Sequence, residues 1–140
     1  MSSFNIVYNY TVNRLTSACF VSSVTVHTKP ENLRCKAVWD TGATMSCISH
    51  HIVEALGLIP VKAINVSGVG GRLLTNAFIV SISLPNDITF PFITVPEGFL
   101  EDSDVLIGMD IISKGDLVIS NEKGETSFSF RTPPDKRITF

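Results

Sequence analysis

Short stretches that alternate in the manner of β-strands, separated by turn residues, run through this sequence. In Phe20–Val26, β-branched and apolar residues alternate along a stretch that is typical of a half-buried strand. Lys29–Asn32 is a predicted turn, and Leu33–Trp39 completes a predicted hairpin. Further strands are predicted at Val61–Val66, Leu73–Leu84, Ile88–Val95, Val105–Ile107, Asp116–Ser120 and Thr126–Arg131. So many short strands indicate an all-β protein, either a small barrel or a sandwich.

One stretch has a clear helical pattern. Apolar residues of Ile48–Leu56 share one helical face, with Ser49 as a suitable N-cap and Gly57 as a suitable stop. Asp110–Ser113 is long enough for a single helical turn. One or two short helices of this kind leave the all-β class unchanged.

Composition excludes several classes of protein. Hydrophobic residues make up 44% of the 140 residues and the mean hydropathy is +0.29, which excludes a disordered chain. The length suits a single domain, residues 1–140. No apolar run approaches the ~18 residues of a membrane span. The formal net charge of −2 gives no basic footprint for nucleic acid. We therefore expect neither a membrane nor a nucleic acid as a partner.

The cysteines and the N-terminus suggest a cellular compartment. Cys19, Cys35 and Cys47 are odd in number and lack C-x-x-C spacing, so neither a disulfide framework nor a zinc site is predicted. Residues 1–5 have neither the basic nor the apolar region of a signal peptide. These features favour free thiols in a cytoplasmic protein, and we expect no metal and no cofactor.

The sharpest motif is an apolar strand that leads directly into Asp40-Thr41-Gly42-Ala43. The simplest interpretation is a turn in which the Asp40 carboxylate accepts backbone N–H bonds. Two other segments favour a functional interpretation. A second apolar strand ends in glycine within Val105–Asp110, and a glycine-rich hairpin tip, Gly68–Gly71, lies between the two.

In this order and at these spacings, the three segments resemble the retropepsin family, the retrovirus-like aspartic proteases, over about residues 20–131. The resemblance implies a small closed barrel with Asp40 as the catalytic carboxylate. It implies that Thr41 locks two catalytic loops together, that Gly42 brings the backbone close to the substrate, and that Ala43 lines the floor. Ile107–Asp110 would support the catalytic loop. A flap over the substrate would consist of Gly68, Val69, Gly70 and Gly71.

The chemistry of this family implies a second copy of the chain. Hydrolysis by aspartic acid uses two carboxylates that share one proton, because like charges about 3 Å apart do not both ionise. This sequence has one Asp-Thr-Gly and no second Asp-[Ser/Thr]-Gly. We therefore expect an aspartic endopeptidase that acts on peptide or protein substrates as a homodimer, with Asp40 from each copy.

Two positions depart from the retroviral pattern. Retroviral enzymes often have an acid after Asp-Thr-Gly-Ala and an arginine after the glycine of the second motif. Thr44 and Met109 stand here instead. Because both members of a charged pair are replaced together, no charge is left unpaired. The pattern fits the cellular and bacterial relatives of retropepsins better than the viral ones.

Other interpretations remain open on the sequence alone. The chain could be a retropepsin-fold dimerisation or peptide-binding module with weak or no catalysis, since a fold does not entail a function. It could also be an unrelated β-barrel in which Asp40 is a turn residue. Cys47 is a nucleophile only if a base lies nearby. His50 and His51 are adjacent, so on a helix they point too far apart to share a metal, and a surface position is expected.

Overall fold

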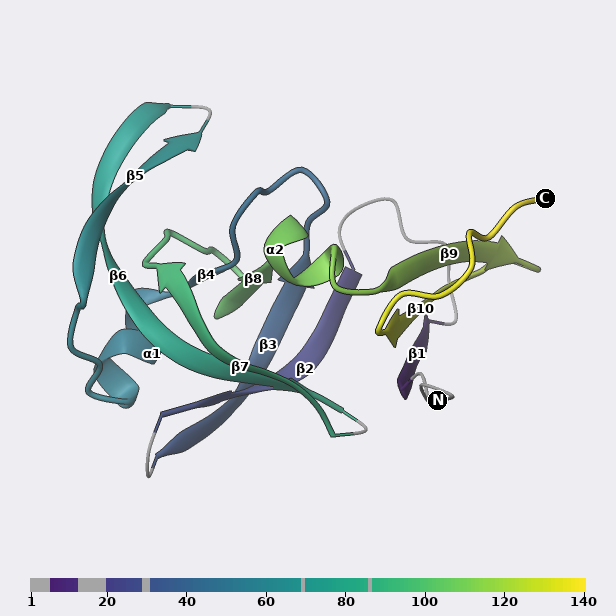
Figure 1. Cartoon of the computed structure of the whole chain (residues 1–140), viewed down its shortest axis with the longest axis horizontal. Helices are drawn as coiled ribbons and strands as arrows, with labels where there is room; N and C mark the ends of the chain where they lie inside the picture. Colours follow the sequence, from purple (N-terminus) through teal and green to yellow (C-terminus); the bar gives the residue numbers. More distant parts are fainter. Residues whose placement is uncertain (1–5, 13–19, 29–30, 69, 86) are drawn as a thin grey trace.

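The computed structural model describes residues 6–12, 20–28, 31–68, 70–85 and 87–140. The described part of the chain is mostly β, with two short helices (Figure 1), as expected. The elements, in order, are β1 (Ile6–Val12), β2 (Phe20–His27), β3 (Asn32–Trp39), β4 (Cys47–Ile48), α1 (His50–Ala55), β5 (Lys62–Gly68), β6 (Gly71–Leu84), β7 (Ile88–Pro96), β8 (Val105–Ile107), α2 (Met109–Ile112), β9 (Asp116–Glu122) and β10 (Glu125–Thr132).

The described strands pair into two sheets. The small sheet has the order β1-β10-β9, and the large sheet has the order β4-β8-β3-β2-β6-β5, with β7 also paired to β6. The small sheet lies at one side of the large one in Figure 1. The expected closed barrel is not found among the described strands. The strand β4, at one end of the large sheet, has only two residues, and β5, at the other end, pairs with β6 alone.

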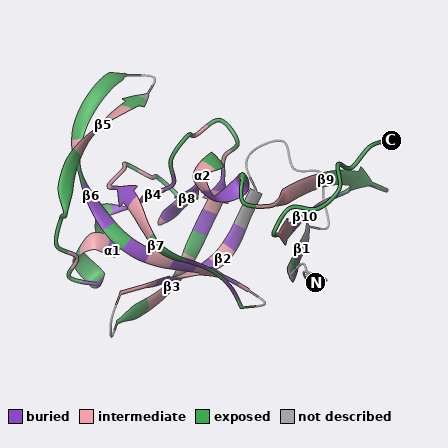
Figure 2. Ribbon diagram, viewed as in Figure 1, coloured by how far each residue is buried: buried purple, intermediate pink, exposed green. Residues whose placement is uncertain are grey.

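The hydrophobic core joins the two sheets through aromatic rings. Trp39, the last residue of β3, packs against Phe128 and Phe130 of β10, with ring centroids 5.2 and 5.3 Å apart. Its indole N–H donates to the Ser22 hydroxyl at 2.9 Å, which satisfies the polar atom of this buried ring. Figure 2 shows further buried residues along β2, β3 and β8. The residue immediately before Asp40 is therefore fixed by the core.

The predicted helix over Ile48–Leu56 is shorter at both ends in the structure. Ser49 is the N-cap, and its side chain accepts a hydrogen bond from the Ile52 amide, as the sequence predicted. Gly57 follows the helix with φ +58°, a left-handed conformation that suits glycine. The residue Ile48 belongs instead to β4, because its backbone pairs with Val105 of β8.

Both ends of the chain add contacts to the expected core. The strand β1, which the sequence analysis did not predict, pairs antiparallel with β10 from Ile6 opposite Thr132 to Val12 opposite Thr126. The segment after β10 forms no strand but is fastened to the small sheet. There the Asp135 amide donates to the Asp116 carboxylate at 2.9 Å. No helix in the described residues is long and apolar enough to span a membrane.

Gly115, between α2 and β9, provides a test of the packing between the helix and the small sheet. A Cβ atom there would lie 2.1 Å from the Arg131 carbonyl oxygen and 2.6 Å from the Phe130 ring. We expect Gly115→Ala to lower the free energy of unfolding by about 3 kcal/mol, because backbone and a buried ring must move. Urea unfolding measures this loss.

Gly70→Ala is the matched control, because a Cβ atom at Gly70 would meet nothing within 4 Å. It is expected to change the free energy of unfolding by less than about 1 kcal/mol. Equal stability of the two variants would contradict the packing described for Gly115.

Candidate active site

Asp40 lies at the point where β3 leaves the large sheet. Residues 37–39 of β3 pair in parallel with residues 105–107 of β8, and the Asp40 amide continues this pairing by donating to the Ile107 carbonyl at 2.9 Å. One carboxylate oxygen of Asp40 accepts a hydrogen bond from the Gly42 amide at 2.8 Å. The Asp40 carbonyl accepts from the Ala43 amide at 3.2 Å. The carboxylate is thus held by its own tight turn and stays partly exposed.

The segment after β8 supports this turn from below, as expected. The amides of Met109 and Asp110 donate to the carbonyls of Ala43 and Thr44, at 2.7 and 3.2 Å. A Cβ atom at Gly108 would lie 2.8–2.9 Å from backbone atoms of Ala43 and Met45. Only glycine allows such a close approach of two backbones. Figure 1 shows α2 directly beside the loop that follows β3.

A buried serine and an aspartate complete the support, and the sequence analysis missed the serine. One oxygen of the Asp110 carboxylate accepts from the Ser46 amide at 2.9 Å, the Ser46 hydroxyl at 2.7 Å and the Ile111 amide at 3.0 Å. The Ser46 hydroxyl in turn accepts from the Gly108 amide at 2.9 Å. Asp110 therefore ties the first turn of α2 to Ser46, at the end of the loop that begins with Asp40. Nothing local in the sequence links positions 46 and 110.

The predicted flap residues form the tip of the β5–β6 hairpin. Gly68 pairs with Gly71, which has φ +102°, and Gly70 is exposed. Val69 lies outside the described residues. The hairpin rises on the same side of the molecule as the loop that follows β3 and contains Asp40 (Figure 1). Among the described residues, no hydrogen bond joins the predicted flap to residues 40–43.

Comparison with known protein families shows the family to which the chain belongs. The family described as Aspartyl protease matches residues 23–111, which is more than half of the sequence. The chain belongs to this family. The match includes the Asp40 loop, the β5–β6 hairpin and the Gly108 segment.

Solved structures show that the chain has a retropepsin-like fold. A retropepsin-like aspartic protease from Rickettsia conorii is 16% identical with a TM-score of 0.60, covering 94% of this chain and 98% of that one. The EIAV protease in complex with the inhibitor HBY-793 is 18% identical with a TM-score of 0.53, covering 73% of this chain and 92% of that one. A comparison with curated proteins finds no significant match.

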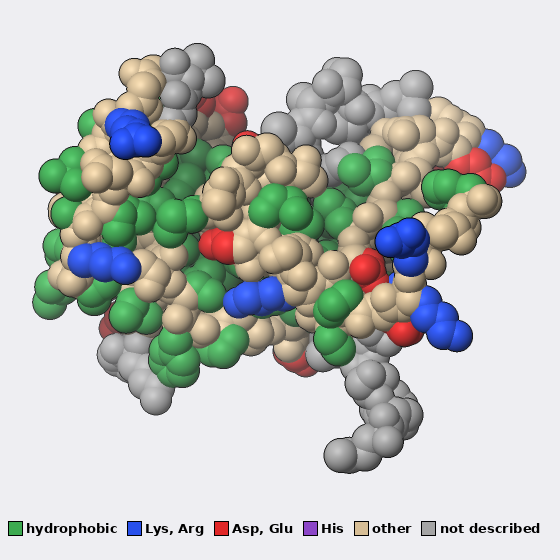
Figure 3. Space-filling view, turned by 45° about the horizontal axis from the view of Figure 1, so that its top comes forward, with side chains coloured by type: hydrophobic (Ala, Val, Ile, Leu, Met, Phe, Trp, Pro, Cys, Tyr) green, Lys and Arg blue, Asp and Glu red, His purple; other side chains and the backbone are tan. Residues whose placement is uncertain are grey.

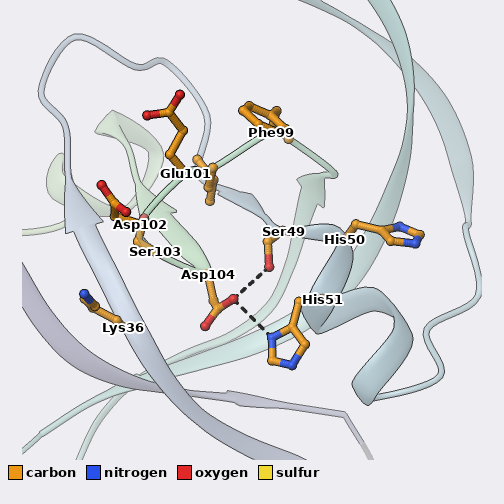
Figure 4. A pocket seen from close by; sticks show the side chains of 11 residues that line it. Lys36, Ser49, His50, His51, Phe99, Glu101, Asp102, Ser103 and Asp104 are labelled. Carbon is orange, nitrogen blue, oxygen red and sulfur yellow. Dashed lines mark hydrogen bonds and ion pairs between the residues drawn. The ribbon is translucent and has the colours of Figure 1, made fainter.

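The adjacent histidines His50 and His51 contact different carboxylates. His51 and Ser49 both face Asp104, whereas His50 points away from them (Figure 4). The His50 ring lies between Glu97 and Glu54, and hydrogen bonds to these two carboxylates raise its pKa. Both rings are exposed and the two face different partners. They therefore lie at the surface, as the sequence predicted, and do not form a shared ligand site.

Cys47 is not the nucleophile that the sequence left as an alternative. Burial, together with the nearby carboxylates of Asp110 and Asp40, raises the pKa of its thiol to about 11. The protein therefore keeps Cys47 protonated at neutral pH, whereas a nucleophilic cysteine needs a thiolate. Gly98 packs against this sulfur so closely that a Cβ atom there would lie 2.9 Å from it.

The Asp110 network predicts a loss of stability when its acceptor is removed. Asp110→Ala leaves the buried Ser46 amide and hydroxyl without their acceptor. We expect the free energy of unfolding to fall by about 1–3 kcal/mol, measured by urea unfolding. Asp102→Ala removes an exposed carboxylate and serves as the control. An equally small effect of both substitutions would show that Asp110 does not hold the loop.

The raised pKa of Cys47 predicts slow alkylation. A pKa of about 11 in place of 9.0 lowers the thiolate fraction at neutral pH about a hundredfold. Higher intrinsic nucleophilicity offsets part of this loss. We expect iodoacetamide at pH 7.5 to modify Cys47 at least about tenfold more slowly than N-acetylcysteine, with the rate still rising above pH 9. Peptide mass spectrometry measures each cysteine separately, and modification as fast as the reference thiol would contradict the predicted protonation.

Proposed function

We propose that this chain is an aspartic endopeptidase that acts as a homodimer, each copy giving Asp40 to a shared pair of carboxylates. The observation that supports this proposal most is that one chain offers a single carboxylate where the reaction needs two. Asp40 sits in a rigid, partly exposed loop, and no second carboxylate of the described residues is hydrogen-bonded to it. A second copy related by a two-fold axis supplies the missing carboxylate in the simplest way.

The paired carboxylates would share one proton and act as a unit. The ionised Asp40 takes a proton from a water molecule, whose oxygen attacks the peptide carbonyl. The protonated Asp40 of the other copy gives its proton to the carbonyl oxygen, which forms a neutral tetrahedral diol. Collapse of the diol breaks the C–N bond, and a proton passes to the leaving amine. The dyad returns with one proton, so the cycle needs only water.

Neighbouring residues would position the substrate. Thr41, exposed next to Asp40, would contact the same loop of the partner, and Gly42 and Ala43 would lie along the bound peptide backbone. The hairpin tip of residues 68–71 would close over an extended peptide and exclude water. Residues 1–140 would act as one domain. Cys35 and Cys47 are free thiols, which suits a reducing cytoplasm.

The decisive experiment is cleavage of a diverse peptide library by the wild-type chain and by Asp40→Asn, from pH 4 to pH 7. The dyad holds one proton in acid, so we expect cleavage to be fastest there and to be slower at pH 9. Asp40→Asn is expected to lower kcat/KM by roughly 10³-fold or more. At low protein concentration the rate should rise with the square of the chain concentration.

Thr44→Ala is the matched control, because Thr44 is an exposed residue of the same loop whose carbonyl, not its side chain, accepts the bond from Asp110. It should retain cleavage. If a folded, dimeric wild-type chain cleaves nothing, the proposal fails and a dimerisation or peptide-binding module with weak or no catalysis replaces it. Equal cleavage by wild type and Asp40→Asn would assign the activity to a contaminant.

A further inference from the structure

A hollow lies between two hairpins, away from the loop that contains Asp40. The β2–β3 and β6–β7 hairpins enclose about 590 Å³ there, a volume within the range of small-molecule sites. Side chains from both hairpins line this hollow, here called the Phe92 pocket: His27, Glu31, Ile79, Ser83, Thr89 and Phe92. In Figure 1 the two hairpins end at the lower edge of the molecule, whereas the Asp40 loop and the tip of the β5–β6 hairpin lie at the upper edge. The pocket is therefore separate from the candidate active site.

A β-bulge presents the ring of Phe92 at this pocket. The register of β6 and β7 shifts between Val80 and Ile82, so that Pro91 and Phe92 together lie opposite Ser81. Phe92 has φ +52°, a left-handed conformation that is rare for a bulky residue. Its amide donates to the Ser81 hydroxyl at 3.1 Å, and the residue is 72% exposed. The strained backbone thus holds out an aromatic ring that the core does not use, and strain of this kind is typical of functional sites.

Three polar side chains of the pocket form a continuous hydrogen-bonded chain. The His27 Nε2 atom lies 2.8 Å from the Ser83 hydroxyl, which in turn lies 2.8 Å from the Thr89 hydroxyl. When Ser83 donates to one neighbour it accepts from the other, so one end of the chain keeps a free donor and the other end a free acceptor. With a neutral imidazole, that acceptor is His27 Nδ1 or Thr89 Oγ1, depending on the direction of the chain. The pocket therefore offers an acceptor in either direction.

The charge of the pocket selects the charge of a ligand. Among the described residues that line it, Glu31 is the only carboxylate, and none is a lysine or an arginine. Figure 3 shows basic and acidic side chains interspersed over the face that it presents, with no broad patch of one sign. The net charge of the whole chain is only −2. The local carboxylate of Glu31 therefore decides, and it attracts a cation and repels an anion.

We propose that the Phe92 pocket binds a small amphipathic amine, that is, an ammonium group on an apolar body. The apolar body packs against Phe92 and Ile79, which is 46% exposed. The ammonium group donates to the Glu31 carboxylate and to the acceptor end of the His27–Ser83–Thr89 chain. An ammonium group has three donors and no acceptor, which suits a site that offers these acceptors. The face of the Phe92 ring attracts the same positive charge.

The test is an NMR titration of the isotope-labelled whole chain at neutral pH with three probes that share a phenyl ring. Phenethylamine carries a positive charge, 2-phenylethanol carries none, and 3-phenylpropionate carries a negative charge. We expect phenethylamine to cause saturable shifts of the pocket amides of β2, β6 and β7, with a dissociation constant on the order of 1 mM. The alcohol should bind about two- to fivefold more weakly, and the carboxylate more weakly still, because an exposed charge contributes modestly.

Two pairs of variants assign the contacts. Phe92→Ala should raise the dissociation constant of phenethylamine at least about fivefold, because the ring supplies apolar contact and attracts the cation. Phe99→Ala is its matched control, since Phe99 is 91% exposed and lies outside the pocket. Glu31→Gln should weaken phenethylamine about two- to fivefold and leave 2-phenylethanol unchanged. Glu122→Gln, at an exposed position of β9 outside the pocket, should change neither.

Phe92→Gly distinguishes a ring held out for a ligand from a ring that supports the fold. Glycine adopts a left-handed φ without strain, and the ring that it removes is largely exposed. We therefore expect this variant to lose phenethylamine binding as Phe92→Ala does, and yet to unfold at a urea concentration close to or above that of the wild type. A clearly lower urea concentration would mean that the ring supports the fold, and would overturn its assignment to a ligand.

This inference goes beyond the proposed function and does not depend on it. Asp40→Asn should bind phenethylamine as tightly as the wild type does, whether or not the chain cleaves peptides. No saturable shift up to about 10 mM phenethylamine, or shifts centred outside the pocket, would overturn the binding site. If 3-phenylpropionate binds as tightly as phenethylamine, the assignment of an amine is wrong. Equal binding by Phe92→Ala and Phe99→Ala would remove Phe92 from the site.

Discussion

The parallel pairing of β3 with β8 is the interaction on which the site depends. Three residues of each strand pair, and the Asp40 amide adds one more bond to the Ile107 carbonyl just as the chain leaves the sheet. Trp39, the last of the three β3 residues, is also held by the small sheet, because its ring packs against Phe128 and Phe130. The backbone of Asp40 is thus fixed by the core, while its carboxylate remains at the surface.

The sequence predicted those parts of the fold that local patterns encode. Alternation located β2, β3 and most later strands, and the Ser49 cap and Gly57 located the start and end of α1. It did not locate β4, because a two-residue strand has no periodicity. It also missed β1, whose pairing depends on β10, more than a hundred residues away. Closure of the sheet into a barrel was an expectation from resemblance, and pairing between distant strands is not written in local pattern.

The residues of the candidate site also divide into those that a local motif reveals and those whose role depends on a distant partner. Asp40, Gly42 and Gly108 were recognisable because each stands in a short motif, and the structure places Gly108 against the Asp40 loop. Ser46 was missed because a serine hydroxyl acquires its role only from its partner, and its partner Asp110 is 64 residues away. The protonated state of Cys47 was equally out of reach, since burial beside two carboxylates is a property of the folded chain.

The strand order of the small sheet has a consequence for synthesis of the chain. The strand β10 is the middle strand, and it pairs with the first strand on one side and with β9 on the other. The strand pairing of residues 6–12 therefore forms only after residues 126–132 have left the ribosome. Contacts this distant in sequence form slowly. Because Trp39 packs on Phe128 and Phe130 of β10, the support beneath Asp40 is also completed only after these distant residues have been made.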